Sequence, residues 1–420
     1  MVVSSREIFV SISLGVEIHL VGRLWCHSRK GRESASFEYN TSWLNYQERF
    51  ALEPALGLTE GAFHTLADQS LFGAIGDSAP DRWGRVLMRR AETQRARTVG
   101  ETPRALSEVD FLLGVNDEAR QGALRFSDKP EGPFLSPYGQ SPIPPLIDLP
   151  RLQSATERFL DEEECAEDLR ILLAPGSSLG GARPKASVYD NDGNLSIAKF
   201  PRKDDEFNVV LWEAVALVLA EKSGITLPTW RLDKMMDKPV LLLRRFDRVG
   251  KERVPFLSAM SMLGAKDNEA HSYLEIVDAL RQHGVDPAAN MAELWRRIVF
   301  SIMISNTDDH LRNHGFLYER QRGWRLSPAY DMNPISIEVK PRILTTSIDY
   351  YDGTASLELA LSVAENFRLS QDEAKVIIKE VSQSTGQWRE VAKRFAIEKS
   401  EIDRMASAFE HRDAQMANNI

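Results

Sequence analysis

The sequence predicts a mixed α+β protein: an amino-terminal α/β subdomain followed by a bilobal core whose carboxy-terminal lobe is all helical. Three observations support this. Strand and turn signals alternate with helical stretches up to about residue 250, and helical patterns dominate residues 251–420. Residues 129–150 hold seven of the 20 prolines, which remove backbone donors and fix φ, so this stretch is predicted to be a linker. A chain of 420 residues also exceeds what one hydrophobic core usually supports.

The composition is that of a globular protein and argues against several classes. The net charge of −9 lacks the basic footprint of a protein that binds nucleic acid by itself, although a DNA-binding partner stays open. The two cysteines, Cys26 and Cys165, lie far apart and form no CxxC pair. This argues against a disulfide framework or a zinc site, and we expect a protein of the reducing cytoplasm.

The amino-terminal subdomain, residues 1–128, is predicted to begin with strands. Glu17 interrupts the apolar run Ile8–Val16 and no small-residue cleavage site follows, so we expect a strand rather than a leader peptide. An Arg-rich helix is expected after Pro80, because proline suits a helix start. No stretch of about 18 uncharged apolar residues exists, so no membrane span is expected.

Residues 151–250 are predicted to form the small lobe of the core. Two apolar stretches, 186–190 and 195–200, flank an Asn-Asp-Gly-Asn turn and predict a hairpin. The apolar stretch 208–223 predicts a helix, and 239–246 predicts a buried strand.

The third segment, residues 251–420, is predicted to be the helical lobe. An apolar helix is expected at Trp295–Ser305. Ser370 followed by Glu373 has the spacing of a capping box, so another helix should begin there.

The main chemical signal is segment 306–314, Asn-Thr-Asp-Asp-His-Leu-Arg-Asn-His. Asp308 followed five residues later by Asn313 has the spacing of a kinase catalytic loop, where the Asp accepts the substrate hydroxyl proton and the Asn binds magnesium. Two alternatives stay open. One is a solvated turn with helix-capping acids. The other is a metal site of His310, His314 and the neighbouring acids, since the i,i+4 spacing of the histidines suits one helix face.

Three further residues fit a phosphoryl-transfer site. Asp331, eighteen residues after Asn313, would be a second magnesium ligand, although Asp, Asn and Pro also cluster there as in a turn. Lys199 lies in an apolar strand and would contact phosphates, unless it is an ordinary edge-strand lysine. Glu213, fourteen residues later in an apolar helix, needs a partner because an unpaired buried carboxylate is costly, and Lys199 is the candidate.

The stretch 176–185, Gly-Ser-Ser-Leu-Gly-Gly-Ala-Arg-Pro-Lys, would put backbone N–H groups around phosphates. It lacks the GxxxxGK[ST] spacing of a P-loop, so a flexible linker is the alternative. The linear order of Gly-rich loop, strand lysine, helix glutamate, apolar strand, D-x4-N and aspartate is that of a kinase. This order weighs more than any single motif.

The chain resembles the HipA-like kinases, the toxin half of HipBA toxin–antitoxin modules. The resemblance covers nearly the whole length. It rests on the predicted catalytic loop and on five further segments: residues 77–85, 113–126, 177–185, 245–248 and 330–331.

The resemblance implies a protein-kinase-like fold and a role for each matching residue. Asp308 would be the catalytic aspartate, and Asn313 and Asp331 would hold Mg²⁺. Lys199 would contact the ATP phosphates, and His310 is also counted among the ATP-binding residues.

The resemblance further implies a hinge and a site of self-control. The strand around Arg244 and Phe246 would hold adenine through backbone groups, although Arg244 stands where the best-known member has an acidic residue. Ser178, or its neighbour Ser177, would be autophosphorylated. The added charge would displace the Gly-rich loop from a site built for ATP phosphates.

The resemblance implies a HipB-like helix-turn-helix antitoxin as partner, with DNA contacted only through that complex and no membrane. It also implies a protein substrate, with aminoacyl-tRNA synthetases among the family's targets, and hence translation arrest and persistence. Two alternatives are a nucleotide-binding co-repressor without turnover and a small-molecule kinase of the aminoglycoside phosphotransferase kind.

Overall fold

The structure is a computed structural model that describes residues 4–29, 31–135, 143–173, 181 and 183–420. The mixture of helix and sheet predicted from the sequence is confirmed. The chain divides into two compact units, each built from two stretches of the chain. Unit 1 comprises Met1–Arg202 and Asp233–Leu257, and unit 2 comprises Lys203–Leu232 and Ser258–Ile420. Over the described residues, no helix is both long and apolar enough to cross a bilayer.

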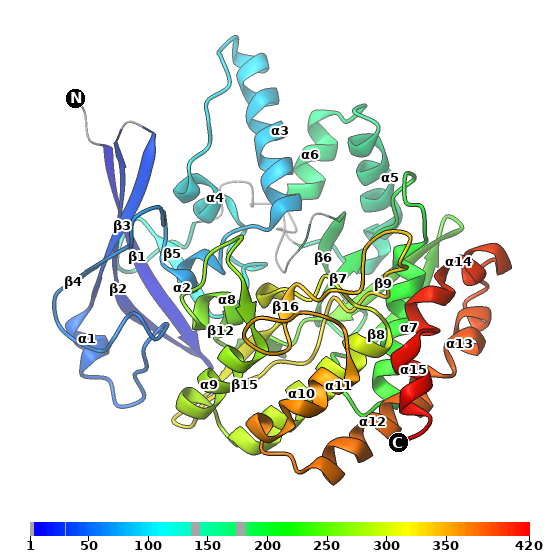
Figure 1. The fold of residues 1–420 in the computed structure, drawn as a ribbon. Helices are drawn as coiled ribbons and strands as arrows, with labels where there is room; N and C mark the ends of the chain where they lie inside the picture. Colours follow the sequence, from blue (N-terminus) through cyan, green and yellow to red (C-terminus); the bar gives the residue numbers. More distant parts are fainter. Residues whose placement is uncertain (1–3, 30, 136–142, 174–180, 182) are drawn as a thin grey trace. The chain divides into compact units, whose positions relative to one another are not determined.

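The amino-terminal part of unit 1 is an antiparallel five-stranded sheet in the order β4-β3-β2-β1-β5 (Figure 1). The strand predicted at Ile8–Val16 is confirmed up to Leu14, where β1 ends, and β1 pairs with β2 along its whole length. The helix expected after Pro80 is also confirmed, and Asp81 caps it by accepting from the Gly84 N–H. The elements are β1 (Ser4–Leu14), β2 (Glu17–Arg29), β3 (Arg32–Tyr39), α1 (Thr41–Leu44), β4 (Ala62–His64), α2 (Gly73–Gly76), α3 (Arg82–Val99), α4 (Glu108–Gly114) and β5 (Leu124–Ser127).

The rest of unit 1 is built on a four-stranded sheet in the order β6-β7-β9-β8. The hairpin predicted over 186–200 is confirmed as β6 and β7, and Gly193 in its turn has a φ of 76°. The elements are η1 (Leu146–Asp148), α5 (Leu149–Leu160), α6 (Ala166–Leu173), β6 (Lys185–Tyr189), β7 (Leu195–Lys199), β8 (Trp230–Met235), β9 (Lys238–Arg244), β10 (Arg248–Val249), β11 (Glu252–Arg253) and β12 (Phe256–Ser258). The first residues of β8 and the last residue of β12 belong to the stretches of unit 2.

One hydrophobic core joins helices α3, α5 and α6 to this sheet. It contains Trp83 from α3, Phe159 from α5 and Val188 from β6, all buried. The Trp83 indole N–H also donates to the Lys185 backbone oxygen at 3.1 Å, so its polar atom is satisfied inside the core. Helix α3 of the amino-terminal part is thereby fixed to the β6–β7 hairpin.

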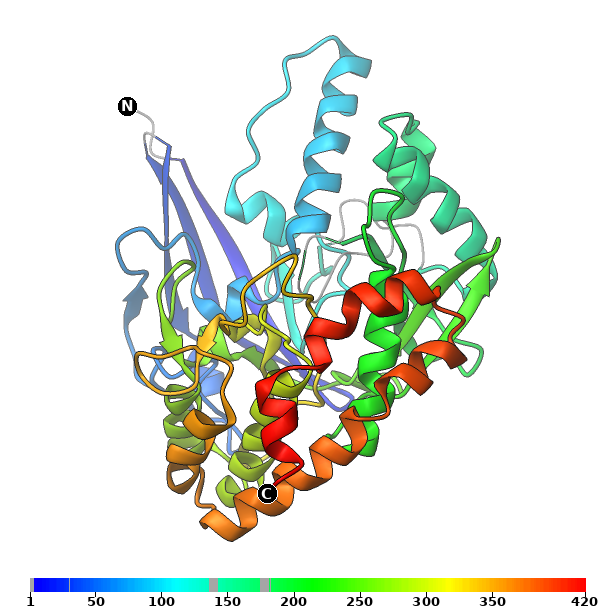
Figure 2. The ribbon, with the colours of Figure 1, turned by 45° about the vertical axis from the view of Figure 1, so that its right-hand side comes forward.

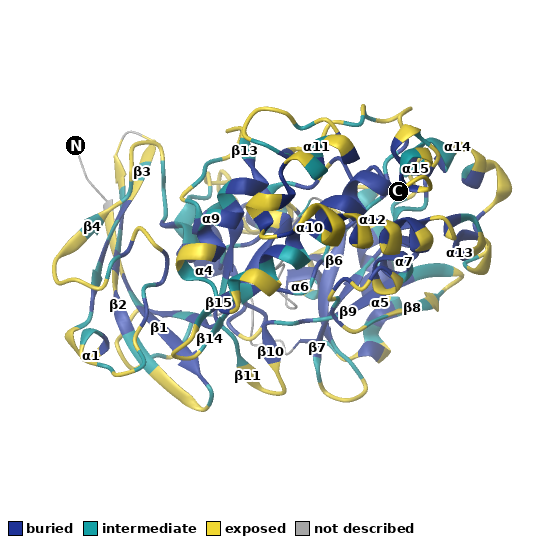
Figure 3. Cartoon of the chain, turned by 60° about the horizontal axis from the view of Figure 1, so that its bottom comes forward, coloured by how far each residue is buried: buried dark blue, intermediate teal, exposed yellow. Residues whose placement is uncertain are grey.

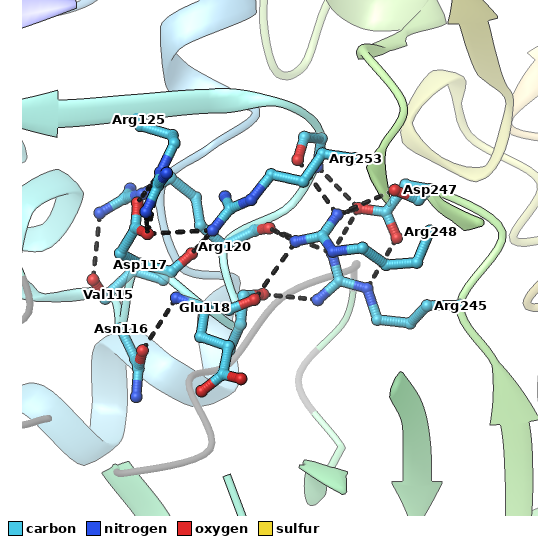
Figure 4. Close-up of polar contacts among 12 residues, drawn as sticks. Val115, Asn116, Asp117, Glu118, Arg120, Arg125, Arg245, Asp247, Arg248 and Arg253 are labelled. Atoms are coloured by element: carbon cyan, nitrogen blue, oxygen red, sulfur yellow. Dashed lines mark hydrogen bonds and ion pairs between the residues drawn. The ribbon is translucent and has the colours of Figure 1, made fainter. Parts of the chain in front are cut away.

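A buried ionic cluster also links the two parts of unit 1 (Figure 4). Asp247 is fully buried and accepts from Arg245 Nε at 2.8 Å, Arg248 at 2.8 Å and the Gly122 N–H at 2.7 Å. Burial alone would raise the pKa of Asp247, but the charges of Arg245 and Arg248 outweigh it and hold the pKa below its ordinary value.

The same cluster has a second carboxylate. Asp117 lies 3.0 Å from Arg253 and accepts from Arg125 Nε, also at 3.0 Å (Figure 4). Segments 117–125 and 245–253 are thus held together by charge, although more than a hundred residues separate them along the chain.

Unit 2 is mainly helical and is organised around α7, which confirms the helix predicted over 208–223. Its elements are α7 (Val209–Lys222), α8 (Ala259–Met262), β13 (His271–Ser272), α9 (Tyr273–His283), α10 (Pro287–Met303), η2 (Leu311–Asn313), β14 (Gly315–Glu319), β15 (Gly323–Leu326), β16 (Thr346–Ser347), α11 (Leu357–Ser362), η3 (Ala364–Phe367), α12 (Gln371–Thr385), α13 (Trp388–Arg394), α14 (Lys399–Phe409) and α15 (Arg412–Ala417). The predicted capping box of Ser370 and Glu373 is confirmed at the start of α12.

Helix α7 is apolar around most of its circumference, and the carboxy-terminal helices cover it (Figure 2). Trp212 of α7 lies against Trp388 and Phe409, each with ring centroids 6.2 Å away. Glu401 of α14 accepts both the Trp212 indole N–H and the Asn208 backbone N–H at 2.8 Å. The second apolar helix, α10, confirms the helix predicted at Trp295–Ser305 up to Met303 and is buried along most of its later turns (Figure 3).

The prediction of an all-helical carboxy-terminal lobe is wrong in part. Strands β14 and β15 form an antiparallel hairpin inside unit 2. Gln321 and Gly323, with φ of 60° and 124°, make its turn possible. The polar stretch Arg320–Arg322 hid this turn, because its charged residues resemble the exposed face of a helix.

Candidate functional site

Helix α10 leads directly into the predicted catalytic loop. The helix ends at Met303, and Ser305 takes a left-handed conformation with a φ of 53°, which stops it. Ser305 Oγ then donates to the backbone oxygen of Ala408 at 2.9 Å. The starting point of the polar loop is therefore fixed by a buried helix end.

The two adjacent aspartates of the loop lie in opposite environments. The Asp308 side chain is 66% exposed, whereas Asp309 is buried. Asp309 accepts from the Tyr273 hydroxyl at 2.5 Å and Ser301 Oγ at 3.4 Å, and it lies 3.1 Å from His314 Nε2. Burial alone would raise the pKa of Asp309, but His314 and Tyr273 outweigh it and lower the pKa below its ordinary value. Asp309 therefore anchors the loop, and Asp308 is the carboxylate that faces solvent.

Asn313 closes the loop and presents a buried oxygen. Its amide nitrogen donates to the Asp308 backbone oxygen at 3.2 Å. Its Oδ1 is buried and has no hydrogen-bond partner among the described residues. Such an oxygen is costly unless something binds it, and hard oxygens are the ligands that Mg²⁺ prefers. This side chain therefore fits the magnesium role expected of it.

Asp331 is tied to the same loop by its neighbours. It has a left-handed φ of 58°, and Asn333 Nδ2 donates to its Oδ1 at 3.4 Å. The Asn333 backbone N–H donates to Asn306 Oδ1 at 3.3 Å, and the Tyr330 hydroxyl donates to the Arg312 backbone oxygen at 2.7 Å. Within unit 2, these hydrogen bonds connect the segment of Asp331 directly to the predicted catalytic loop.

The alternative metal site of His310 and His314 gains no support. His314 is buried and lies against Asp309. Across residues 4–29, 31–135, 143–173, 181 and 183–420, no group of three or more His, Cys, Asp or Glu is placed to hold a metal ion. Arg312, the cation of the loop, pairs with Asp267 on the surface.

The predicted ATP-binding residues of unit 1 lie on or just after neighbouring strands. Lys199 ends β7 and is the register partner of Lys185 on β6 and Leu241 on β9. Arg244 ends β9, and the Phe246 ring lies 6.2 Å from that of Phe256.

Two predictions about the site stay untested. Glu213 is buried in α7 of unit 2, whereas Lys199 belongs to unit 1, so their pairing stays a prediction. Ser177 and Ser178 lie outside the described residues.

Sequence reasoning missed four side chains that shape the loop: Tyr273, Asn306, Asn333 and Lys340. Asn306 and Asn333 stand within two residues of predicted aspartates, so proximity along the chain was an available signal. Tyr273 lies 36 residues from Asp309 and Lys340 lies 32 residues from Asp308, so no pattern near the loop in the sequence points to either residue.

Comparisons with known proteins identify the family of the chain and relatives that are named as putative kinases. The model of the family described as "HipA-like C-terminal domain" matches residues 177–410. "Putative kinase Y4mE" of Sinorhizobium fredii is 23% identical over 327 residues, which is 70% of this chain and 71% of that protein. "Putative kinase Y4dM" of the same organism is 27% identical over 223 residues, 47% of this chain and 51% of that protein. A "Putative kinase" of Haemophilus influenzae is 31% identical over 86 residues, only 20% of this chain and 24% of that protein.

A solved structure supports the fold over the whole chain. It is the Shewanella oneidensis toxin–antitoxin complex of HipA, HipB and operator DNA, matched with a TM-score of 0.63 at 15% identity. The match covers 97% of this chain and 96% of that one.

Proposed function

We propose that this chain, which belongs to the family of the HipA-like C-terminal domain, is an ATP- and magnesium-dependent serine/threonine kinase of the HipA toxin type. The observation that supports this most is the loop of unit 2. In that loop Asp308 is exposed and its neighbour Asp309 is buried, while Asn313 bonds to the Asp308 backbone oxygen and keeps an unsatisfied side-chain oxygen. This is the arrangement that phosphoryl transfer needs, because catalysis of that reaction is mostly positioning and electrostatic stabilisation.

In this proposal Asp308 orients the acceptor hydroxyl and takes its proton as the new oxygen–phosphorus bond forms. Asn313 and Asp331 would hold Mg²⁺, which when bound neutralises charge on the nucleotide phosphates. Asp309 keeps the loop in place through Tyr273 and His314.

The nucleotide is proposed to use residues of unit 1. Lys199 would contact the phosphates and the backbone near Arg244 and Phe246 would bind adenine, while His310 would approach ATP from the loop. Ser178 or Ser177 would be the site of autophosphorylation, which switches the enzyme off.

The proposed setting is that of a cytoplasmic toxin–antitoxin pair. A HipB-like helix-turn-helix protein would be the partner and would carry the contact to DNA. The substrate would be a protein, and an aminoacyl-tRNA synthetase is the first target to test.

The proposal is tested with Asp308→Asn, which keeps shape and removes the proton acceptor. After incubation with Mg·ATP, an intact-mass spectrum should show added phosphate in the unsubstituted protein and none in the variant, with unchanged circular dichroism. Asp372→Asn, at an exposed position of α12, is the matched control and should behave like the unsubstituted protein. Undiminished phosphate incorporation in Asp308→Asn would refute the kinase proposal.

A further inference from the structure

A cation from a distant part of unit 2 stands beside the exposed carboxylate of the loop. Lys340 Nζ lies 3.3 Å from Asp308 Oδ1 and 3.4 Å from the Thr307 backbone oxygen. In the part of the chain that the structure describes, no other cationic side chain forms an ion pair with Asp308.

The segment that carries Lys340 is fastened to the loop by its neighbours. Arg342 donates to Ser305 Oγ and to the Ile302 backbone oxygen, each at 3.0 Å. Thr345 donates to the Thr307 backbone oxygen twice, from its N–H at 3.1 Å and from its hydroxyl at 2.9 Å. Because these bonds reach the residues just before Asp308, the position of Lys340 follows that of the loop.

The Lys340–Asp308 contact should add little to the stability of the fold. The two side chains are 39% and 66% exposed, and ion pairs this exposed contribute little to stability. The cation within the loop, Arg312, is engaged elsewhere because it pairs with Asp267. The loop therefore has one half-exposed cation next to its exposed carboxylate, supplied from outside the D-x4-N motif.

We propose that Lys340 is a further residue of the phosphoryl-transfer site: it neutralises Asp308 before substrates bind and then faces the transferring phosphoryl group. In the reaction the bond from the γ-phosphorus to the bridging oxygen breaks, and its electron pair leaves with ADP. A bond forms between phosphorus and the acceptor oxygen, and the hydroxyl proton passes to Asp308. The phosphoryl oxygens stay negative throughout, and an ammonium group beside Asp308 stabilises that charge. This inference rests on the proposed kinase function.

The test compares affinities for Mg·ADP and for Mg·ADP with aluminium fluoride, which mimics the phosphoryl group in flight. In Lys340→Met, binding of Mg·ADP should change less than about twofold, while binding of the mimic weakens about 100-fold and kcat for autophosphorylation falls about 100-fold or more. Lys340→Arg keeps the charge and should recover most of both losses. Lys375→Met, at an exposed position of α12, is the matched control and should change none of these quantities.

Three outcomes overturn the inference: unchanged affinity of Lys340→Met for the mimic, an equal loss of affinity for Mg·ADP, or a rise in kcat. The last would mean that the contact blocks the site. If the unsubstituted protein binds the mimic but transfers no phosphate, the proposed function is wrong. If Lys340→Met transfers phosphate as well as the unsubstituted protein, only the role of Lys340 is wrong.

Discussion

Asp308 and Asp309 are identical residues whose surroundings give them different roles. The partners of Asp309 come from α9, from α10 and from the end of the loop itself, so this one carboxylate connects three parts of the chain. Asp308 has only the exposed contact with Lys340 for its side chain among the described residues. The first should matter for stability and the second for chemistry.

Asp309→Ala should lower the free energy of unfolding by about 3 kcal/mol, because the Tyr273 hydroxyl loses its buried acceptor and the buried His314 ring loses the carboxylate beside it. Asp308→Ala should change it by less than about 0.5 kcal/mol, as for an ordinary surface substitution. Urea unfolding followed by tryptophan fluorescence measures both. Equal destabilisation by the two variants would contradict the anchoring role.

The residues of the loop could be predicted only where their signal is local. Asp308 and Asn313 are recognisable because they have the spacing of the D-x4-N motif of kinases. Whether Asp308 or Asp309 faces solvent could not be predicted, because Tyr273 reaches the loop only through tertiary packing.

At the scale of elements, the N-cap of helix α15 is His411, which is not one of the residues usually preferred at that position. His411 Nδ1 accepts from the Ala414 N–H at 3.3 Å, and Nε2 lies 3.2 Å from the Met303 backbone oxygen. Both contacts suit a neutral ring with its proton on Nε2. Burial, together with the charge of Arg342, lowers the pKa of His411 to about 4.

This cap makes stability depend on pH. The unfolded histidine titrates near pH 6.5 and the folded one near 4, so below about pH 6.5 the unfolded state binds the proton first. The stabilisation is present above pH 6.5 and is lost as pH falls toward 4, and it amounts to about 2 kcal/mol between pH 7.5 and pH 5. Urea unfolding at these two pH values should show that the His411→Asn variant, which can still cap, loses about 2 kcal/mol less than the unsubstituted protein. Equal losses would rule this out.

Elements were predictable where their pattern is strong and short-range. The β6–β7 hairpin has an Asp-Gly turn between apolar runs, and α7 is a long apolar run with Asn208 as its cap. The β14–β15 hairpin was missed because its strands are short and its turn is charged, so its pairing is decided by packing in unit 2.

At the scale of the whole molecule, the ionic cluster of unit 1 joins two segments that lie far apart in the sequence. Asp247 and Gly122 are 125 residues apart in sequence and are joined by one hydrogen bond. The string Arg245-Phe-Asp-Arg248 could be recognised in the sequence as a family signature. Its physical role could not, because the groups that enclose it come from segment 117–125, which supplies backbone oxygens to Arg245 and Arg248 and the Gly122 N–H to Asp247.

Asp247→Ala should destabilise unit 1 by about 3–5 kcal/mol, since it leaves Arg245 and Arg248 as buried cations without a counter-charge. Combining it with Arg245→Met should recover part of the loss, which a double-mutant cycle of unfolding free energies measures. Asp192→Ala, in the exposed hairpin turn, is the control and should have almost no effect. A variant at Asp247 as stable as that control would mean that the cluster is not required.

The way α7 is covered has a consequence for synthesis. Asn208, at the start of this apolar helix, bonds to Glu401, which lies 193 residues further along the chain. At about 5–20 residues per second, a ribosome needs roughly 10–40 s to make that stretch. During this time the helix exists without the side chains that enclose it. The nascent chain is therefore expected to expose this apolar segment for tens of seconds, and apolar surface exposed during folding favours aggregation.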